Sequence, residues 1–318
     1  MNSSSGLYFT YFQTNLINKY QMLGFIISLS IFTISCLISC ITILVLSKFS
    51  GRQFSFTKLL IITISTNNIY LLIYFLENLF IYYNFWNIQI PSSVCKSILY
   101  LKNIVKYMCI SNLISILASS CIIIIDTKCE KPFSKCYRFF TRFGSFILLP
   151  ISIVLLLPYG IFANYLNSVS LCFLPNFIEI MIYFDVTILI VIPYMFVGIF
   201  FSIVVLNREL VFSERKGVLW MNKLTLIIAT MYLIFSLPNF GYCAYFLKTK
   251  IFDEEIVTEF STVATIITVH LYNMYFSITP VAFLAVTRFR NELGSIVVHF
   301  KIIKLPRDSV ILNKIIVP

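Results

Sequence analysis

The apolar residues of this chain fall in seven long blocks, separated by short segments that are polar and mostly basic. Each block is roughly 20 to 28 residues long, which is enough for an α-helix to cross the ~30 Å hydrocarbon core of a bilayer. The pattern predicts an all-α fold, a seven-transmembrane helix bundle with spans at about 23–46, 56–82, 97–126, 143–163, 178–206, 224–247 and 260–286.

The end of the seventh block carries a break and then a change of pattern. Pro280 lies deep in the apolar segment, where it removes a backbone donor and bends the helix. Arg288 and Arg290 follow and indicate an exit from the membrane. Charged and aliphatic residues then alternate at helical spacing, so residues 287–318 are predicted to form a short amphipathic eighth helix and a short cytoplasmic tail.

Composition supports a membrane protein. Of 318 residues, 59% are hydrophobic and 12% are charged, and the mean hydropathy is +0.92. These values exclude a soluble globular domain, whose apolar fraction is lower and whose charged fraction is about twice as high.

The net charge of +11 is spread between the apolar blocks, which argues against a nucleic-acid partner. When alternate loops are assigned to opposite sides, 18 of the 24 Lys and Arg residues lie on one side. The positive-inside rule makes that side cytoplasmic. We therefore predict a multi-pass plasma-membrane protein in the lipid bilayer, with its N-terminus extracellular.

Residues 1–22 form the predicted extracellular N-terminus. They contain no basic start followed by an apolar core, so we expect no cleavable signal peptide. Asn2-Ser3-Ser4 matches the acceptor pattern for N-glycosylation, which makes Asn2 a candidate glycosylation site.

Polar residues inside the spans predict which helix faces point inward. Asn67 and Asn68 are adjacent amides in the second span, and amides in hydrocarbon need partners, so at least one should face the bundle interior. In the third span, Asn112, Ser115 and Ser119 recur at spacings of three and four residues. This single polar stripe is typical of a central helix.

Counting ~1.5 Å per residue from the basic residue at each cytoplasmic helix end places four ionisable side chains at one height, near the outer boundary. They are Glu77, Lys106, Asp185 and His270. We interpret them as the mouth of an outward-facing ligand pocket, to which Tyr242 and Tyr272 are also assigned. The alternative is that each side chain extends separately to the lipid headgroups. Below them, Asn68, Ser236 and Asn273 form a middle layer that is polar but uncharged.

Of the nine cysteines, only Cys95 and Cys172 are predicted to lie on the outside, where a disulfide can form. A bond between them would tether the start of the third span to the long loop after the fourth. Cys129 and Cys136 are predicted to be cytoplasmic, reduced and open to S-palmitoylation.

Motifs for enzymatic chemistry are missing from the sequence. There are two histidines and no HExxH, no paired carboxylates within a span and no glycine-rich phosphate loop. We therefore expect no enzymatic activity, no metal site and no cofactor.

These features together resemble the rhodopsin-like (class A) G-protein-coupled receptors, over essentially the whole chain. The most specific likeness is Thr279-Pro280-Val281-Ala282-Phe283, which is similar to that family's NPxxY motif, with Phe289 in the eighth helix beyond it. Phe235-Ser236-Leu237-Pro238 is similar to the CWxP motif. Residues 63–68 resemble the NLxxxD pattern, and Asp126-Thr127-Lys128 stands where the family has DRY.

The chain departs from the family at residues tied to signalling. Asn68 replaces the Asp that binds sodium, so we expect no allosteric effect of sodium. Thr127 replaces the Arg that engages the G protein, and Lys128 supplies only a point charge nearby. The family's Trp, Asn and Tyr are replaced by Ser236, Thr279 and Phe283.

The resemblance implies a divergent receptor of the invertebrate orphan or chemoreceptor type. It would sense an extracellular peptide or small chemosensory ligand and transmit the signal to a heterotrimeric G protein. The residues assigned to activation and coupling are Asn68, Asp126, Thr127, Lys128, Ser236, Pro238, Thr279, Pro280, Phe283 and Phe289. Two other functions stay open: a seven-span transporter or channel, and a receptor relic that folds without coupling.

Overall fold

The computed structural model describes residues 3–48, 54–84, 91–128, 135–147, 149–157, 161, 164–166, 171–173, 187–208, 219–251 and 259–299. These residues are almost all helical, apart from one short β hairpin. In chain order the elements are α1 (Ser3–Ser47), α2 (Phe54–Asn84), α3 (Ser92–Lys128), α4 (Lys135–Phe143), the 3-10 helix η1 (Gly144–Phe146), α5 (Leu149–Leu155), β1 (Asn164–Leu166), β2 (Leu171–Phe173), the π-helical turn η2 (Thr187–Val191), α8 (Ile192–Leu206), α10 (Leu219–Ile251), α11 (Glu259–Ile278), the 3-10 helix η3 (Thr279–Ala285) and α12 (Thr287–His299).

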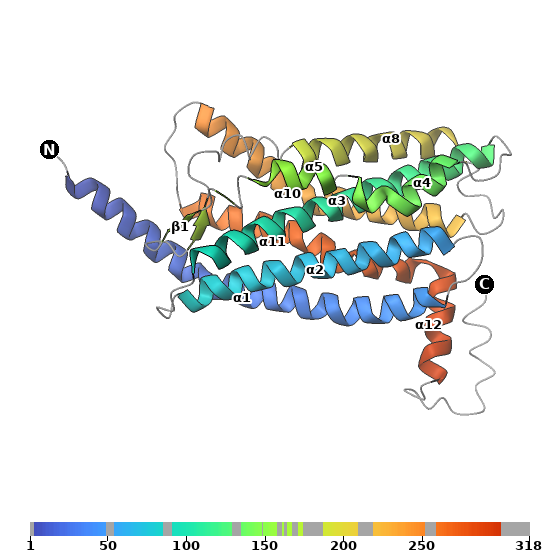
Figure 1. Cartoon of the computed structure of the whole chain (residues 1–318), viewed down its shortest axis with the longest axis horizontal. Helices are drawn as coiled ribbons and strands as arrows, with labels where there is room; N and C mark the ends of the chain where they lie inside the picture. The colour runs from blue at the N-terminus through green and yellow to red at the C-terminus, as the bar shows by residue number, and fades with distance from the viewer. Residues whose placement is uncertain are drawn as a thin grey trace.

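The long helices run side by side as a bundle, and α12 lies across one end of it (Figure 1). Among the described residues, five helices are long and apolar enough to cross a membrane: Leu23–Ser47, Ser55–Phe80, Lys96–Lys128, Thr187–Leu206 and Leu219–Tyr242. The prediction of a helical membrane protein is confirmed at this level, and the number of seven spans stays a prediction. Helix α1 begins at Ser3. It therefore also includes most of residues 1–22, which were predicted to precede the first span.

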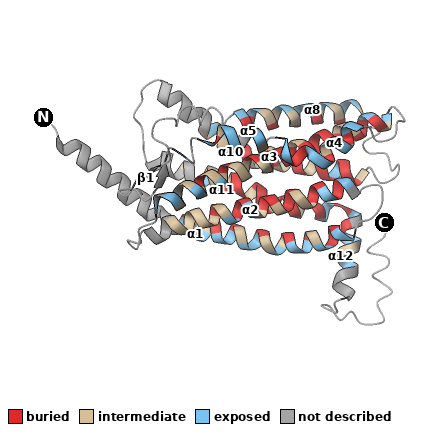
Figure 2. Ribbon diagram, in the orientation of Figure 1, coloured by how far each residue is buried: buried red, intermediate tan, exposed pale blue. Residues whose placement is uncertain are grey.

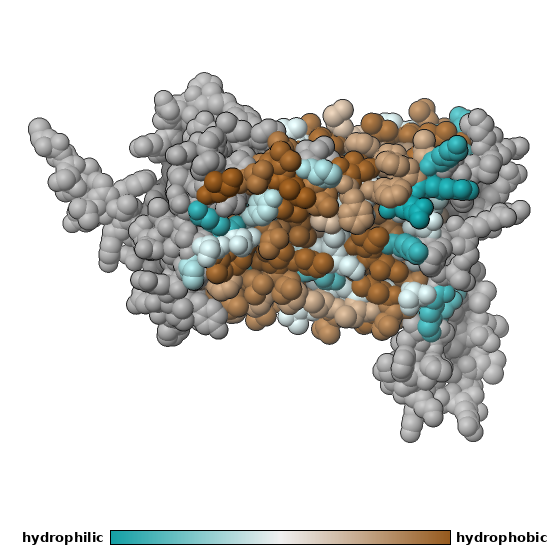
Figure 3. Space-filling model, viewed as in Figure 1, coloured by the Kyte–Doolittle hydropathy of each residue, from teal (hydrophilic) through white to brown (hydrophobic). Residues whose placement is uncertain are grey.

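The outer surface of the bundle is apolar. Large hydrophobic side chains on every long helix are exposed, including Leu37, Met195 and Val205, with exposed fractions of 64%, 62% and 71%. Figure 3 shows this surface as a broad brown region between the two ends of the bundle. Such a surface is unfavourable in water and is suited to lipid, in which helices satisfy their own backbone hydrogen bonds.

Helix α3 is the centre of the bundle, as its polar stripe predicts. It is the most enclosed of the five candidate spans, and Figure 2 shows buried residues along most of its length. Asn112, Ser115 and Ser119 have no exposed surface at all. Small and polar side chains on this face allow neighbouring helices to approach closely and to bond to it.

In the described residues, the region of the predicted fourth span, 143–163, is not one continuous α-helix, and the span itself stays a prediction. Helix α4 ends at Phe143, a 3-10 turn follows, and α5 begins only at Leu149. Pro150 is the second residue of α5, where its missing N–H costs nothing because the first turn of a helix has no acceptor for it. By Asn164 the chain is already in a strand.

The hairpin was not predicted, because its residues were assigned to a loop. Strands β1 and β2 pair antiparallel, with Tyr165 opposite Cys172, and both contact α3. We call the end of the bundle that carries β1 and β2 the hairpin end. The side chains of Cys95 and Cys172 lie outside the described residues, so their disulfide stays a prediction. The described cysteines, Cys36, Cys40, Cys109, Cys121 and Cys136, are free thiols.

The bend predicted at Pro280 coincides with a change of helix type. Helix α11 ends at Ile278, η3 continues as a 3-10 helix, and Val286 is extended with φ −93° and ψ 116°. The chain then turns into α12. The rings of Phe283 and Phe289 pack across this turn with centroids 5.6 Å apart, and each is 1% exposed. This contact fixes α12 against the bundle.

Close packing of η1 on α3 generates a stability prediction. The hydroxyl of Ser111 donates to the Gly144 carbonyl at 2.6 Å, and a Cβ added at residue 144 would lie 2.5 Å from the Cβ of Ser115. Gly144→Ala should therefore destabilise the protein by about 1–3 kcal/mol through overpacking. Thermal unfolding in detergent measures the effect.

The control is Gly198→Ala on α8, where an added Cβ meets nothing within 4 Å. Because alanine favours a helix more than glycine does, this change should be neutral or slightly stabilising. Equal melting temperatures for Gly144→Ala and the wild type would contradict the close contact.

Candidate functional site

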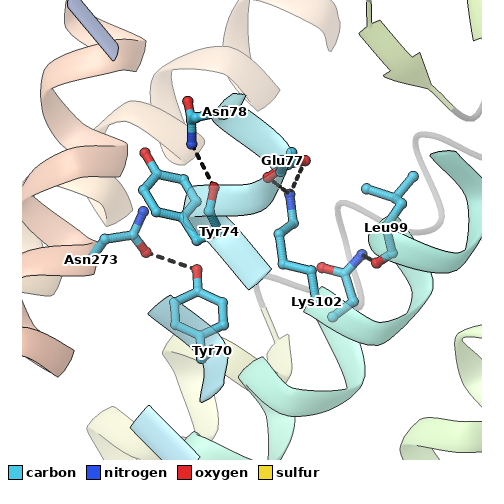
Figure 4. A network of polar contacts seen from close by, with 8 residues as sticks. Tyr70, Tyr74, Glu77, Asn78, Leu99, Lys102 and Asn273 are labelled. Carbon is cyan, nitrogen blue, oxygen red and sulfur yellow. Dashed lines mark hydrogen bonds and ion pairs between the residues drawn. The ribbon is translucent and has the colours of Figure 1, made fainter. Parts of the chain in front are cut away.

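A network of polar side chains joins α2, α3 and α11 near the hairpin end (Figure 4). Its charged part is an ion pair between α2 and α3. The ammonium of Lys102 donates to both carboxylate oxygens of Glu77, at 2.6 and 2.8 Å. The two side chains are 19% and 20% exposed, so the pair is neither fully solvated nor fully buried.

The three described members of the predicted outer layer all contact a neighbouring side chain within the bundle. Glu77 pairs with Lys102, the Lys106 ammonium lies 5.3 Å from the centroid of the Tyr272 ring, and His270 Nε2 is 3.2 Å from the Tyr74 hydroxyl. These contacts show that the side chains point toward other helices. Asp185, the fourth member, lies outside the described residues.

Lys102 was missed as a site residue. It lies four residues before Lys106, so both ammonium groups lie on one face of α3. That spacing was the available signal. Its partner could not be read from the spacing, because the pairing with Glu77 depends on how α2 is rotated against α3.

Two tyrosines on α2 extend the network to α11. The Tyr70 hydroxyl donates to Asn273 Oδ1 at 2.7 Å, and Tyr74 contacts His270 through both its hydroxyl and its ring. The Asn78 amide donates to the Tyr74 carbonyl at 2.8 Å. Tyr70 and Tyr74 were also missed, although their four-residue spacing with Asn78 predicts one helix face.

Below this network lies the uncharged polar layer. The Asn67 amide donates to the Phe276 carbonyl of α11 at 3.5 Å, and the Ser35 hydroxyl of α1 donates to Asn68 at 2.7 Å. Asn67 is 2% exposed. The prediction that at least one of these two amides faces the interior is therefore confirmed, and the other bonds to a further helix.

Helix α3 joins the same layer. The Asn112 amide donates to the Thr66 hydroxyl at 2.6 Å. Several other buried polar atoms make no hydrogen bond among the described residues, including Asn112 Oδ1, Asn273 Nδ2 and the Tyr272 hydroxyl. The Tyr272 side chain is 3% exposed and lies beneath Lys106. Among the described residues, its hydroxyl is therefore a buried group with unused hydrogen-bonding capacity.

Helix α10 is tied to α8 at the predicted proline bend. Ser236 donates to the carbonyl of Tyr232, so the Tyr194 hydroxyl of α8 is the donor in its 3.1 Å bond to Ser236. Pro238 lies inside α10, two residues further on, and the helix continues through it. Tyr242, assigned to the ligand pocket, is partly buried one turn beyond Pro238.

The far end of the bundle carries the residues assigned to coupling. Asp126 is buried and Lys128 is exposed. The Thr127 hydroxyl donates to the Ile123 carbonyl of its own helix at 2.7 Å, so it makes an intrahelical bond. Ser120 and Thr225 join α3 to α10 by a 2.7 Å hydrogen bond between two fully buried hydroxyls.

Around the bend after α11, Thr279, Pro280, Phe283 and Phe289 are all buried. The Thr279 hydroxyl donates to the Tyr275 carbonyl at 2.7 Å. Asn2, the glycosylation candidate, lies outside the described residues. Within the described part of the chain, no group of three or more His, Cys, Asp or Glu side chains is placed to bind a metal ion.

The ion pair between α2 and α3 generates a second prediction. Glu77→Gln removes the carboxylate and leaves the Lys102 ammonium partly buried beside a neutral amide. We expect a loss of about 1–2 kcal/mol in stability, between the values for exposed and buried pairs. The exchanged variant Glu77→Lys/Lys102→Glu should recover part of it. Thermal unfolding of the three proteins tests the pair.

Lys128→Gln is the control, because it removes an exposed charge from the same helix. It should leave the melting temperature unchanged. A double exchange no more stable than Glu77→Gln would show that the pair adds no stability through its charges.

Comparison of the chain with protein-family models and with curated proteins found no match in either. The function proposed below therefore depends on the residues and geometry of this chain.

Proposed function

We propose that this protein is a seven-span receptor of the rhodopsin-like type, which binds an extracellular peptide or small chemosensory ligand and signals to a heterotrimeric G protein. The observation that carries the proposal is the turn from α11 into α12. A span that changes from an α-helix to a more tightly wound 3-10 helix at Thr279-Pro280, and then turns into an amphipathic helix held by Phe283 and Phe289, resembles the end of the seventh span in that family.

In this proposal the ligand binds at the hairpin end. The Glu77–Lys102 pair and Lys106 provide partly exposed charges there, and the buried side chains of Tyr74, His270 and Tyr272 add polar and aromatic groups beside them. The Tyr272 hydroxyl provides hydrogen-bonding capacity below them. Asp185 and Tyr242 complete the proposed pocket. A few polar groups at defined positions can orient a bound ligand.

The uncharged layer beneath the proposed pocket argues against a transporter or channel. A conducting path needs polar groups that line a continuous route. Here the amides of Asn67, Asn68 and Asn112 bond to groups on neighbouring helices, and they thereby join the helices to one another. This arrangement suits a bundle that changes shape without opening through its centre.

The proposed topology has the N-terminus outside the plasma membrane, Asn2 glycosylated, and Cys95 joined to Cys172. Packing of the hairpin against α3 supports the disulfide, since Cys95 lies in the first turns of α3 and Cys172 lies in β2. The bond would hold the hairpin over the end of the bundle where the ligand enters.

A receptor scaffold that binds ligand without coupling is the second candidate. The observation that favours it is the intrahelical bond of the Thr127 hydroxyl. A short side chain that bonds to its own helix cannot reach a partner in the way that an arginine does.

Expression in cells that contain promiscuous G proteins, with peptide and odorant libraries as ligands, tests the proposal. Asp185→Ala and Lys106→Met should reduce ligand potency at least tenfold, while Lys48→Met, at an exposed position of the other end, should not. A response unaffected by both pocket variants would refute the pocket. If the ligand binds without any G-protein response, and Thr127→Arg restores that response, the second candidate is identified.

The hydrogen bond between α3 and α10 leads to a further prediction. If α10 moves away from α3 during signalling, the buried Ser120–Thr225 bond must break. Thr225→Val removes the acceptor of this hydrogen bond, which stabilises the resting state by about 1 kcal/mol. The change should therefore raise basal signalling up to roughly fivefold. The control is Thr230→Val, whose exposed hydroxyl bonds only to the Leu226 carbonyl of its own helix. Equal basal signalling in the two variants would contradict the role of this bond.

A further inference from the structure

Helix α4 has three distinct faces, and within the part of the chain that the structure describes one of them packs against the bundle. Tyr137 and Thr141 are buried against the neighbouring helices, and α4 contacts α2 and α3. Gly144 and Ser145 continue this buried face into η1. The orientation of the other two faces is therefore set by the packing of the first.

The second face of α4 is aromatic and outward. Phe139, Phe143 and Phe146 are 51%, 50% and 47% exposed. The rings of Phe139 and Phe143 are 5.8 Å apart, and Phe140 lies 5.8 Å from Phe139 on the other side. Because residues three and four apart lie on one helix face, these rings form a continuous aromatic stripe along the outside of the bundle.

The third face is basic. Lys135, Arg138 and Arg142 follow one another at spacings of three and four residues, and all three are exposed. No acidic residue occurs between residues 135 and 147. The stripe covers about 10 Å of helix length. The guanidinium of Arg142 lies 5.7 Å from the centroid of the Phe143 ring, so the basic and aromatic stripes meet at that residue.

Much of the described surface is apolar, and Figure 3 shows hydrophilic groups beside the brown surface in the half farther from the hairpin, among others. Cations next to a hydrocarbon-facing surface are costly unless an anion accompanies them. A phosphate group on a lipid is an anion that carries its own apolar chains. Arginine suits phosphate because its planar fork donates two parallel hydrogen bonds.

We propose that α4 is a binding site for an anionic phospholipid, with the headgroup on Lys135, Arg138 and Arg142 and an acyl chain along Phe139, Phe143 and Phe146. The site is independent of the proposed receptor function, because it is formed by the outer wall of the bundle. The charge of the stripe selects an anionic lipid over a zwitterionic one.

Electron spin resonance of spin-labelled lipids in proteoliposomes tests the site with the full-length chain. The measurement compares how strongly the protein immobilises labelled phosphatidylglycerol and labelled phosphatidylcholine. The wild type should prefer phosphatidylglycerol. In Arg138→Gln/Arg142→Gln the preference should fall by up to about fivefold for each charge removed. Arg138→Lys/Arg142→Lys keeps the charge and should keep most of the preference.

The matched control is Lys48→Gln/Arg290→Gln, which removes two exposed positive charges from the same end of the bundle, at the end of α1 and on α12. This pair should leave the preference nearly unchanged. Equal losses in both pairs would overturn the proposal, since the effect would then reflect total charge. An unchanged preference in Arg138→Gln/Arg142→Gln, together with the loss of a protein dimer, would assign the stripe to a second copy and would also overturn it.

Discussion

Hydrogen bonds that leave α2 toward its neighbours hold this bundle in register. Lipid chains are as apolar as leucine, so burying leucine drives helices together only weakly in a membrane, and interhelical polar contacts matter more than in water. The segment from Thr66 to Asn68 bonds to three helices: Ser35 on α1, Asn112 on α3 and the Phe276 carbonyl on α11. Each bond is worth about 1 kcal/mol, but together they set the rotation and height of four helices.

Contacts with α2 hold α11 in place, whereas the 3-10 helix η3 that follows α11 is less constrained. Toward the hairpin end, Asn273 and His270 are bound to Tyr70 and Tyr74 of α2. Beyond Pro280 the backbone is a 3-10 helix, whose hydrogen-bond geometry is poorer than that of an α-helix. Changes of shape are therefore easier in η3 than in α11. In a receptor, this difference would let ligand contacts at one end be expressed as movement at the other.

The central place of α3 determines what the next segment does. The segment that follows α3 packs back against that helix. At this contact Ser111 and Ser115 lie so close to residue 144 that only a glycine fits there. The contact lies at the point where α4 is followed by the 3-10 helix η1. It also fixes the rotation of α4, so that Tyr137 faces inward while the aromatic and basic stripes face outward. The outer surface that we assign to a lipid thus depends on one close contact inside the bundle.

Local patterns in the sequence account for part of this fold. Apolar block length predicted helices that suit a membrane, the stripe through Asn112 and Ser119 predicted a central α3, and Pro280 predicted the bend into α12. These follow from helix period and backbone chemistry, which act over a few residues. The span predicted at 143–163 contains the 3-10 helix η1 and the short helix α5, which apolarity alone did not predict.

Tertiary structure decided which residues meet. Glu77 and Lys102 are 25 positions apart, and Tyr70 and Asn273 are 203 apart. Whether such side chains pair depends on the relative rotation and height of two helices, and one residue of change in either turns a side chain by ~100° and moves it by ~1.5 Å. No local pattern contains that information. The ion pair, the tyrosine contacts and the three faces of α4 could therefore be found only once the helices were packed.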